Sequence, residues 1–255
     1  MRLKYLGAGV LALSIALGSG VVAGPAIAAD DKADADKAST ETADADKGSS
    51  NEIVHRVFDN KHLEKVEAGK ELVYKFKRSA SNPELLGQEF SDDITLKVKA
   101  AKPDGGRDVD LQIYTGDRAR DLQQMPDRLH NPVFLVYFNQ AVNTFGMLSG
   151  GKPPYLTRLF SNGFKDKAKM EPVKVTYNGK EIDAYRIEMK PYLGDSSVPK
   201  MQGWENAEYV ITMSDEVPGE VVDLRSIYTN KYDKKDLRLV ERITLDGVSG
   251  LDEAK

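Results

Sequence analysis

The chain has 255 residues, with 36 Lys and Arg against 40 Asp and Glu, and no Cys. Without cysteine there is no disulfide framework, so the fold must be held by its own apolar core. The formal net charge of −4 comes without a basic cluster, which argues against nucleic acid or an anionic lipid surface as a main partner.

The first 29 residues have the pattern of a cleavable secretory signal peptide. Arg2 and Lys4 precede an apolar run over residues 6–22, and small residues at 26–29 resemble a cleavage site. Glycine and serine interrupt the run, whereas a transmembrane anchor needs about 20 unbroken apolar residues. We therefore expect export to the periplasm, cleavage near Asp30 and no transmembrane anchor afterwards.

Residues 30–50 form a segment rich in Ala, Asp and Lys, in which the sequence ADADK occurs twice. The segment contains no large apolar residue, so it cannot bury enough surface to offset the entropy lost on ordering. A disordered acidic linker is expected here, followed by a single globular domain over residues 51–255.

Three segments in the first half of this domain alternate apolar and polar side chains, as half-buried antiparallel strands do. They cover residues 72–77, 94–100 and 109–113, and the turn sequence PDGG joins the second to the third. The apolar side of these strands includes Phe76, Leu96 and Leu111. A sheet with water on one face has this pattern.

The middle of the chain changes to helical spacing. Pro132 suits the first turn of a helix, and glycines 150–151 end it. Its apolar stripe contains Phe134, Phe138, Val142 and Phe145. A second short helix is expected from residue 153 to Gly163, which makes a helical hairpin. The aromatic stripe either packs as core against the concave face of the sheet or lines an apolar cavity.

The clearest local signal is Asn178-Gly179, because both residues tolerate the positive φ angles that a two-residue type I′ turn requires. The turn predicts a hairpin over residues 173–189 in which Val175 faces Ile182. Later apolar residues of the second strand have the opposite phase, so we expect a β-bulge near Ala184.

Three further strands are expected at residues 207–213, 220–228 and 237–245, and Ile211 of the first points inward. The total is about eight strands. The expected fold is mainly β with a helical insertion, a curved, half-open antiparallel sheet that encloses the helical hairpin.

Glu241 breaks the pattern of its strand, because regular alternation places it on the same face as Leu239 and Ile243. A buried carboxylate needs a partner or a raised pKa. Four interpretations stay open: that Glu241 pairs with an inward arginine such as Arg225 or Arg186, that it lies at a sheet rim, that it forms a polar spot in a ligand cavity, or that a bulge turns it outward.

No catalytic or metal-binding signature occurs in the sequence. His55, His62 and His130 lack the spacing of a metal site, and Ser149 lacks the preceding glycine of a nucleophile elbow. Aspartates near the early strands fit solvated faces better than paired glycosidase carboxylates. We expect no enzyme activity, no cofactor and no metal, and an envelope hydrolase is the least favoured reading.

The succession of strands, helical insertion and further strands in an exported chain resembles the periplasmic lipoprotein-carrier superfamily (LolA- and LolB-like proteins), at the level of architecture over residues 71–245. Four segments are similar to parts of uncharacterised exported proteins of Gram-negative bacteria: NPVFL (131–135), LSGG (148–151), YNGK (177–180) and EVPG (216–219). The resemblance implies a curved sheet around helices that close its apolar side. It transfers no functional residue.

We therefore expect periplasmic, non-enzymatic binding of an apolar or amphipathic ligand, either a lipid or the acyl chain of a lipoprotein. The expected ligand-binding residues are Phe76, Leu96, Leu111, Phe134, Phe138, Val142, Phe145, Ile211 and Glu241. The alternative is a structural or interaction module of the cell envelope, in which the same side chains fill the core and a rim loop or sheet edge binds an envelope protein.

Overall fold

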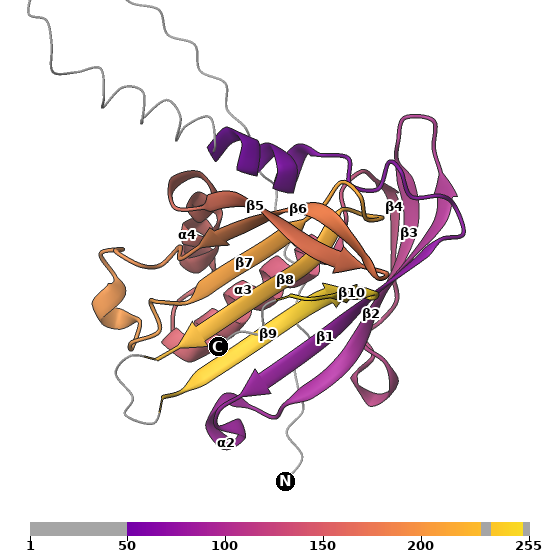
Figure 1. Ribbon diagram of the computed structural model, residues 1–255. Coiled ribbons are helices and arrows are strands. Elements are labelled where there is room, and N and C mark those ends of the chain that lie inside the picture. Colours follow the sequence, from indigo (N-terminus) through magenta and orange to yellow (C-terminus); the bar gives the residue numbers. More distant parts are fainter. Residues whose placement is uncertain (1–49, 231–235, 252–255) are drawn as a thin grey trace, which may run out of the picture.

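The computed structural model describes residues 50–230 and 236–251. The expected signal peptide, and all but the last residue of the expected linker, lie outside these ranges. Ten described strands form one antiparallel sheet in the order β10-β5-β6-β7-β8-β9-β1-β2-β3-β4 (Figure 1). Their bounds are β1 Glu71–Ala80, β2 Phe90–Ala101, β3 Arg107–Ile113, β4 Gln123–Arg128, β5 Lys169–Tyr177, β6 Lys180–Met189, β7 Glu208–Met213, β8 Val221–Thr229, β9 Arg238–Leu245 and β10 Val248–Ser249.

The main helices form the expected hairpin, with α3 at Val133–Ser149 and α4 at Pro153–Asp166. Gly150, in the left-handed region at φ 72°, ends α3, and prolines occupy the first turn of α4. Shorter helical segments are α2 Pro83–Leu86, η2 Gly116–Arg118 and η3 Val198–Lys200. Among the helices of the described ranges, none has the length and hydropathy needed to cross a membrane.

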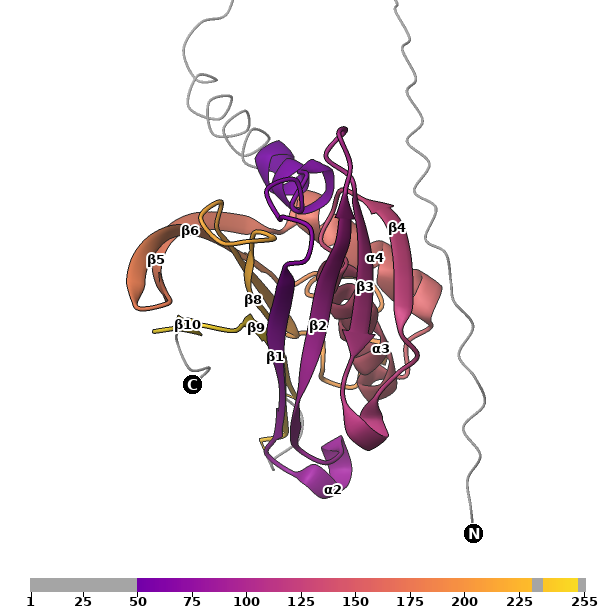
Figure 2. The same ribbon diagram turned by 90° about the vertical axis from the view of Figure 1, so that its right-hand side faces the viewer.

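The sheet is open, because β4 and β10 are its two edges. It bends around α3 and α4, which lie on one of its faces, while β5 and β6 curl away from them (Figures 1 and 2). The expected fold class is confirmed, but the sequence patterns missed two strands. β4 contains Pro126 and is exposed on both faces, so it shows no alternation, and β10 is only two residues long.

The β5–β6 hairpin confirms the expected turn. Asn178 and Gly179 have φ angles of 49° and 79°, and Val175 faces Ile182. The bulge expected near Ala184 is wrong, since pairing of the two strands runs without a register shift from the turn to their far ends. The change of buried face along β6 comes instead from the bend of the sheet, which covers one face near the turn and the opposite face farther along (Figure 2).

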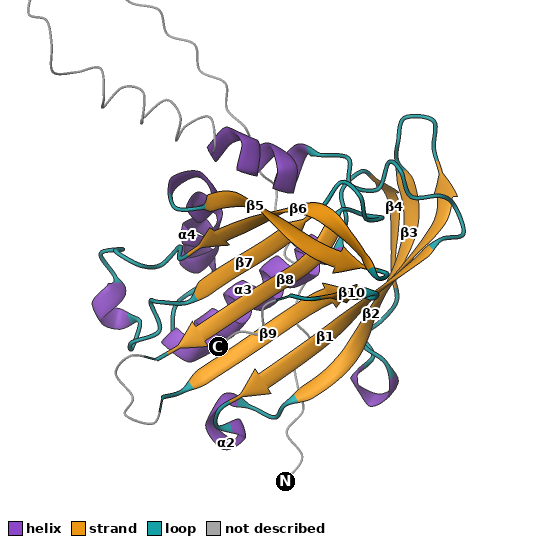
Figure 3. Ribbon diagram, viewed as in Figure 1, coloured by secondary structure: helices purple, strands orange, loops and turns teal. Residues whose placement is uncertain are grey.

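An additional helix precedes the first strand. Residues 50–54 are α-helical and continue into η1 (His55–Asp59), a π-helical turn. We call residues 50–59 the N-terminal helix. It crosses one end of the sheet, at the top of Figure 3. Ile53 and Val57 are almost fully buried, so the helix is part of the core.

Candidate functional site

Most of the expected ligand-binding residues lie in one continuous apolar core. Eight of the nine are buried: Phe76, Leu96, Leu111, Phe134, Val142, Phe145, Ile211 and Glu241. Phe138 is half-buried. The strand residues come from the face of β1, β2, β3, β7 and β9 that the helices cover, so the sheet brings together positions far apart in the sequence.

Phe138 lies in a seam between helices. Its ring centroid is 5.7 Å from those of Phe58 in the N-terminal helix, Phe134 in α3 and Phe160 in α4, and 5.6 Å from that of Phe164 in α4. Edge-on and tilted pairs at such separations are favourable aromatic contacts. We call these five rings the aromatic seam. It joins three helices through apolar contacts alone.

Farther along α3, tyrosines occupy the space between helix and sheet. Phe145 stacks on Tyr192 with 3.7 Å between ring centroids. The hydroxyl of Tyr137 donates to the carbonyl oxygen of Arg225 at 2.8 Å, and that of Tyr228 donates to the carbonyl oxygen of Ala141 at 3.1 Å. The Tyr137 hydroxyl of α3 thus binds the backbone of β8, and the Tyr228 hydroxyl of β8 binds the backbone of α3. Both buried hydroxyl groups therefore have a hydrogen-bond partner.

Glu241 is a buried charge at the centre of this helix–sheet interface, with 4% of its surface exposed. It lies directly opposite Arg78 on β1, and the two side chains form an ion pair. Thr144 of α3 donates to the other carboxylate oxygen at 2.9 Å, and Arg78 also donates to the carbonyl oxygen of Leu86 at 2.6 Å. Burial raises the pKa of Glu241, and the charge of Arg78 opposes that rise.

A small packing gap adjoins this charged pair. It is lined by Phe76, Tyr137, Gln140, Ala141, Ser226, Glu241, Arg242 and Ile243, and leaves no room for a water molecule. The interface between α3 and the sheet therefore combines a buried ion pair with imperfect packing.

The expected pairing of Glu241 with Arg225 or Arg186 is wrong. Ser226 is the residue of β8 opposite Glu241, so Arg225 points to the other face of the sheet. Arg186 is paired with Glu188, at 2.6 Å. The true partner is Arg78, which continues the inward alternation of Leu72, Tyr74 and Phe76, so the pattern of β1 did contain a signal for it that was missed. The sheet is regular around Glu241, so no bulge turns it outward.

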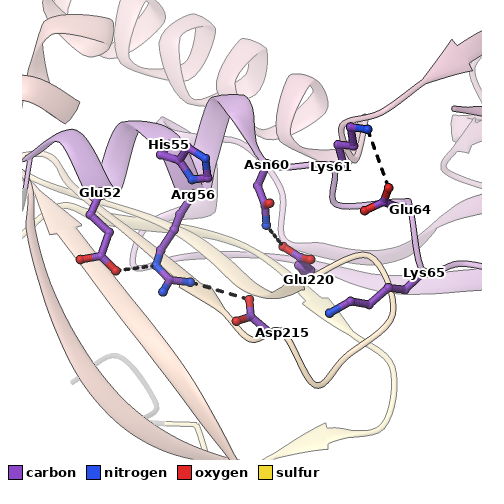
Figure 4. A pocket seen from close by; sticks show the side chains of 9 residues that line it. All are labelled: Glu52, His55, Arg56, Asn60, Lys61, Glu64, Lys65, Asp215 and Glu220. Atoms are coloured by element: carbon purple, nitrogen blue, oxygen red, sulfur yellow. Dashed lines mark hydrogen bonds and ion pairs between the residues drawn. The ribbon is translucent and has the colours of Figure 1, made fainter. Parts of the chain in front are cut away.

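A polar cleft of about 340 Å³ opens on the surface between the N-terminal helix and the β7–β8 turn. Its lining is Glu52, His55, Arg56, Asn60, Lys61, Glu64, Lys65, Asp215 and Glu220 (Figure 4). The volume is at the lower end of the range of small-molecule sites. None of these residues was expected from the sequence to belong to a site, because they come from a helix, a loop and a turn without a shared motif.

Most charges in this cleft are paired with one another. Arg56 contacts Glu52 at 3.0 Å and Asp215 at 3.7 Å, and its guanidinium lies 3.9 Å above the ring centre of Tyr185. Lys61 pairs with Glu64 at 3.7 Å. Of these contacts, the pair between Arg56 and Asp215 joins the N-terminal helix to the β7–β8 turn.

Glu220 lies in the wall of the cleft with only 7% of its surface exposed. Its φ of 59° is in the left-handed region, which a non-glycine residue seldom adopts. Asn60 donates its amide to one carboxylate oxygen at 2.5 Å. Burial and then the nearby charge of Asp215 raise the pKa of Glu220, and Asn60, Lys65 and Arg56 oppose the rise.

His62 joins the N-terminal helix to the start of α3. Its Nε2–H donates to the carbonyl oxygen of Arg56 at 2.7 Å, and its Nδ1 accepts from the backbone N–H of Asn131 at 3.3 Å. The Asn131 amide in turn donates to the Tyr74 hydroxyl and the Gly219 carbonyl oxygen. Burial lowers the pKa of His62, so this neutral ring has a structural role.

The other candidates for chemistry are also engaged in local structure. Asp92 accepts from the backbone and hydroxyl of Thr115 at 2.9 and 2.8 Å, and Asp108 pairs with Lys102 at 3.1 Å. Ser149 donates to the carbonyl oxygen of Phe145 within its own helix, at 2.7 Å. In the described part of the chain no group of three or more His, Cys, Asp or Glu is placed to hold a metal ion.

Comparison with known proteins gives only distant likenesses. No family model matches the sequence, and no curated protein matches it. Among solved structures, the complex of Pseudomonas aeruginosa MucA and MucB gives a TM-score of 0.33 at 12% identity, covering 81% of this chain and 59% of that one. The chain thus spans less than two thirds of the length of MucB.

Two further solved structures match at a similar level. Mycobacterium tuberculosis lipoprotein LppX gives a TM-score of 0.30 at 10% identity, covering 82% of this chain and 99% of that one. A DUF1329 family protein from Desulfovibrio piger gives 0.25 at 11%, covering 81% and 95%. Likenesses this remote carry no argument about family or function, and what the chain does must be argued from its own residues.

Proposed function

We propose that this chain is an exported, non-enzymatic binding protein for an amphipathic ligand, and that the acyl chain of a lipid or lipoprotein enters between the α3–α4 hairpin and the sheet. The proposal places the protein in the periplasm, in accord with its N-terminal sequence. The observation that carries it is the buried Arg78–Glu241 pair beside a packing gap, in an interface whose other buried side chains are mostly apolar or aromatic.

The argument is one of energetics. A buried ion pair is often no more stabilising than well-packed apolar side chains of the same volume, since both charges lose their hydration. An interface that only had to stay closed would be served better by such side chains. A charged pair and a packing gap at the centre of the interface reduce the free energy needed to move α3 away from β1 and β9. A ligand can then take the place of the helix against the sheet.

The expected site residues give such a ligand its surface. When the hairpin moves, Phe76, Leu96, Leu111 and Ile211 on the sheet and the stripe of α3 become the walls of an apolar groove. Arg78 then lies beside the groove with a charge that suits an anionic head group. Glu241 keeps the unliganded state neutral by pairing with it.

Uptake of a fluorescent fatty acid tests the proposal. Replacing Phe138 with Asn should abolish uptake, and should cost less stability than the roughly 3–5 kcal/mol typical of a fully packed phenylalanine, because Phe138 is only half-buried. Tyr177→Asn is the matched control, since Tyr177 is also a half-buried aromatic residue but lies at the end of β5, where it pairs with Val248 of β10, apart from the proposed groove. The control should retain uptake.

A second candidate is an envelope interaction module with a permanently packed core. It is favoured by the burial of eight of the nine expected site residues and by the lack of room for water beside Glu241. This candidate predicts no uptake by the native protein and equal loss of stability in both variants. That result would replace the binding proposal.

A further inference from the structure

The polar cleft at the N-terminal helix carries a second inference, which does not depend on the first. Seven of its lining residues are charged: Glu52, Arg56, Lys61, Glu64, Lys65, Asp215 and Glu220. Five of these pair with one another, in the Glu52–Arg56–Asp215 group and the Lys61–Glu64 pair. Within the described residues, one cation, Lys65, and one anion, Glu220, are left without a partner of opposite charge.

Glu220 is the more unusual of the two. A carboxylate that is more than nine-tenths buried normally has a cationic partner or several hydrogen bonds. Glu220 has one bond, to the neutral amide of Asn60, and its nearest anionic neighbour, Asp215, increases the cost of its charge. A cation in the cleft would remove that cost.

Lys65 supplies the complementary half. Its exposed side chain extends into the cleft from the side opposite Arg56 (Figure 4). The charge of Lys65 stabilises the ionised form of Glu220, but the two side chains are too far apart to form an ion pair. The two unmatched charges thus line one cavity of about 340 Å³.

We propose that this cleft binds a small zwitterionic group, whose ammonium faces Glu220 and whose anionic end faces Lys65. Such a ligand matches both charges at once and leaves the net charge of the cleft unchanged. A ligand with only a positive charge would be attracted by Glu220 and repelled by Lys65, and a ligand with only a negative charge would be attracted by Lys65 and repelled by Glu220. Two sources have this chemistry, a soluble zwitterion and the head group of an aminophospholipid.

Isothermal titration calorimetry with sn-glycero-3-phosphoethanolamine, whose phosphodiester and ammonium each carry one charge, tests the proposal, with ethylamine and dimethyl phosphate as single-charge controls. Glycerophosphoethanolamine should bind at least about tenfold more tightly than either control, the effect expected for one additional charge-assisted contact. Glu220→Gln and Lys65→Met should each weaken binding by about tenfold. The glutamine keeps an oxygen for Asn60, so the fold is retained.

The matched controls are Asp93→Asn and Lys75→Met, which remove the charges of an exposed ion pair that lies outside the cleft. They should leave the affinity within about twofold. Equal binding of the three compounds, no binding, or an unchanged affinity in Glu220→Gln would overturn the proposal. The failure of fatty-acid uptake would leave it intact, because the acyl chain is proposed to bind elsewhere.

Vesicle sedimentation then identifies the source. If vesicles of phosphatidylethanolamine with phosphatidylglycerol retain the protein and vesicles of phosphatidylglycerol alone do not, the ligand is a lipid head group. If neither retains a protein that binds glycerophosphoethanolamine, the ligand is a soluble zwitterion. Retention by both kinds of vesicle that persists in Glu220→Gln would show surface adsorption and contradict a head-group site.

Discussion

The Arg78–Glu241 pair gives the sharpest prediction for stability. Removing one partner of a buried ion pair typically costs about 3–5 kcal/mol, because the other charge stays buried without compensation. Arg78→Met should approach this cost, since Glu241 is 4% exposed and would retain only neutral partners, among them the Thr144 hydroxyl and the Gln140 side chain. Glu241→Leu should cost less, because the Arg78 side chain is 14% exposed and still donates to the Leu86 carbonyl oxygen.

The double variant Arg78→Met/Glu241→Leu should lie within about 1 kcal/mol of the native protein or above it, because no charge remains to be desolvated. Urea denaturation monitored by circular dichroism gives the free energy of unfolding of all four proteins, and hence the coupling between the two changes. If the stability lost in the double variant equals the sum of the losses in the two single variants, the reasoning is refuted. The proposed function also requires the double variant to take up less fatty acid than the native protein, despite its stability.

Three further predictions concern other parts of the molecule. Gly179→Val should destabilise the hairpin by about 1–2 kcal/mol through backbone strain at φ 79°, whereas Asn178→Gly should not; equal melting temperatures would refute the turn geometry. The pKa of His62 is lowered in the folded state, so the unfolded chain binds a proton first and the free energy of unfolding should fall as pH drops below 6.5. His62→Gln should lose that slope, while the opposite slope from the raised pKa values of Glu220 and Glu241 stays in both proteins; identical slopes would count against the His62 role. Limited proteolysis should leave a fragment beginning near residue 51, and protection of residues 30–49 equal to that of the strands would contradict the linker.

The sheet and the helical hairpin could be predicted because their signals are local. Alternation with period two marks strands that bury one face, and Asn178-Gly179 sets its register by backbone conformation alone. The same reasoning placed Glu241 on the buried face of β9. β4 was missed because it has no periodic pattern. The N-terminal helix was missed although Ile53 and Val57, with Val54 and Phe58 beside them, have the four-residue spacing of a helix, since the pattern extends over only one turn.

The two corrections have a common cause. The phase change along β6 looked like a bulge, and Arg225 looked like an inward partner, because both inferences treated the sheet as flat and each strand as having one buried face. In the bent sheet, β6 changes its covered face, and β8 buries residues on both faces, among them Arg225 and Ser226. Curvature depends on the packing of the whole sheet and leaves no short sequence signal.

The polar cleft shows what sequence patterns cannot reach. Asn60 and Glu220 are 160 positions apart and meet only because the N-terminal helix lies across the β7–β8 turn. A weak signal did exist, since the sequence VPG at 217–219 marks a tight turn just before Glu220. The turn predicts an unusual backbone conformation near Glu220, but it predicts neither the burial of the Glu220 side chain nor its lack of a cationic partner.

Native mass spectrometry of the protein purified without detergent from its own host is the most direct test of amphipathic ligand binding. The account predicts a species heavier than the mature polypeptide by the mass of one acyl-bearing molecule, released on mild collisional activation. The Phe138→Asn variant should lack it and the Tyr177→Asn variant should retain it. A native protein found only at the mass of the bare polypeptide would contradict the account.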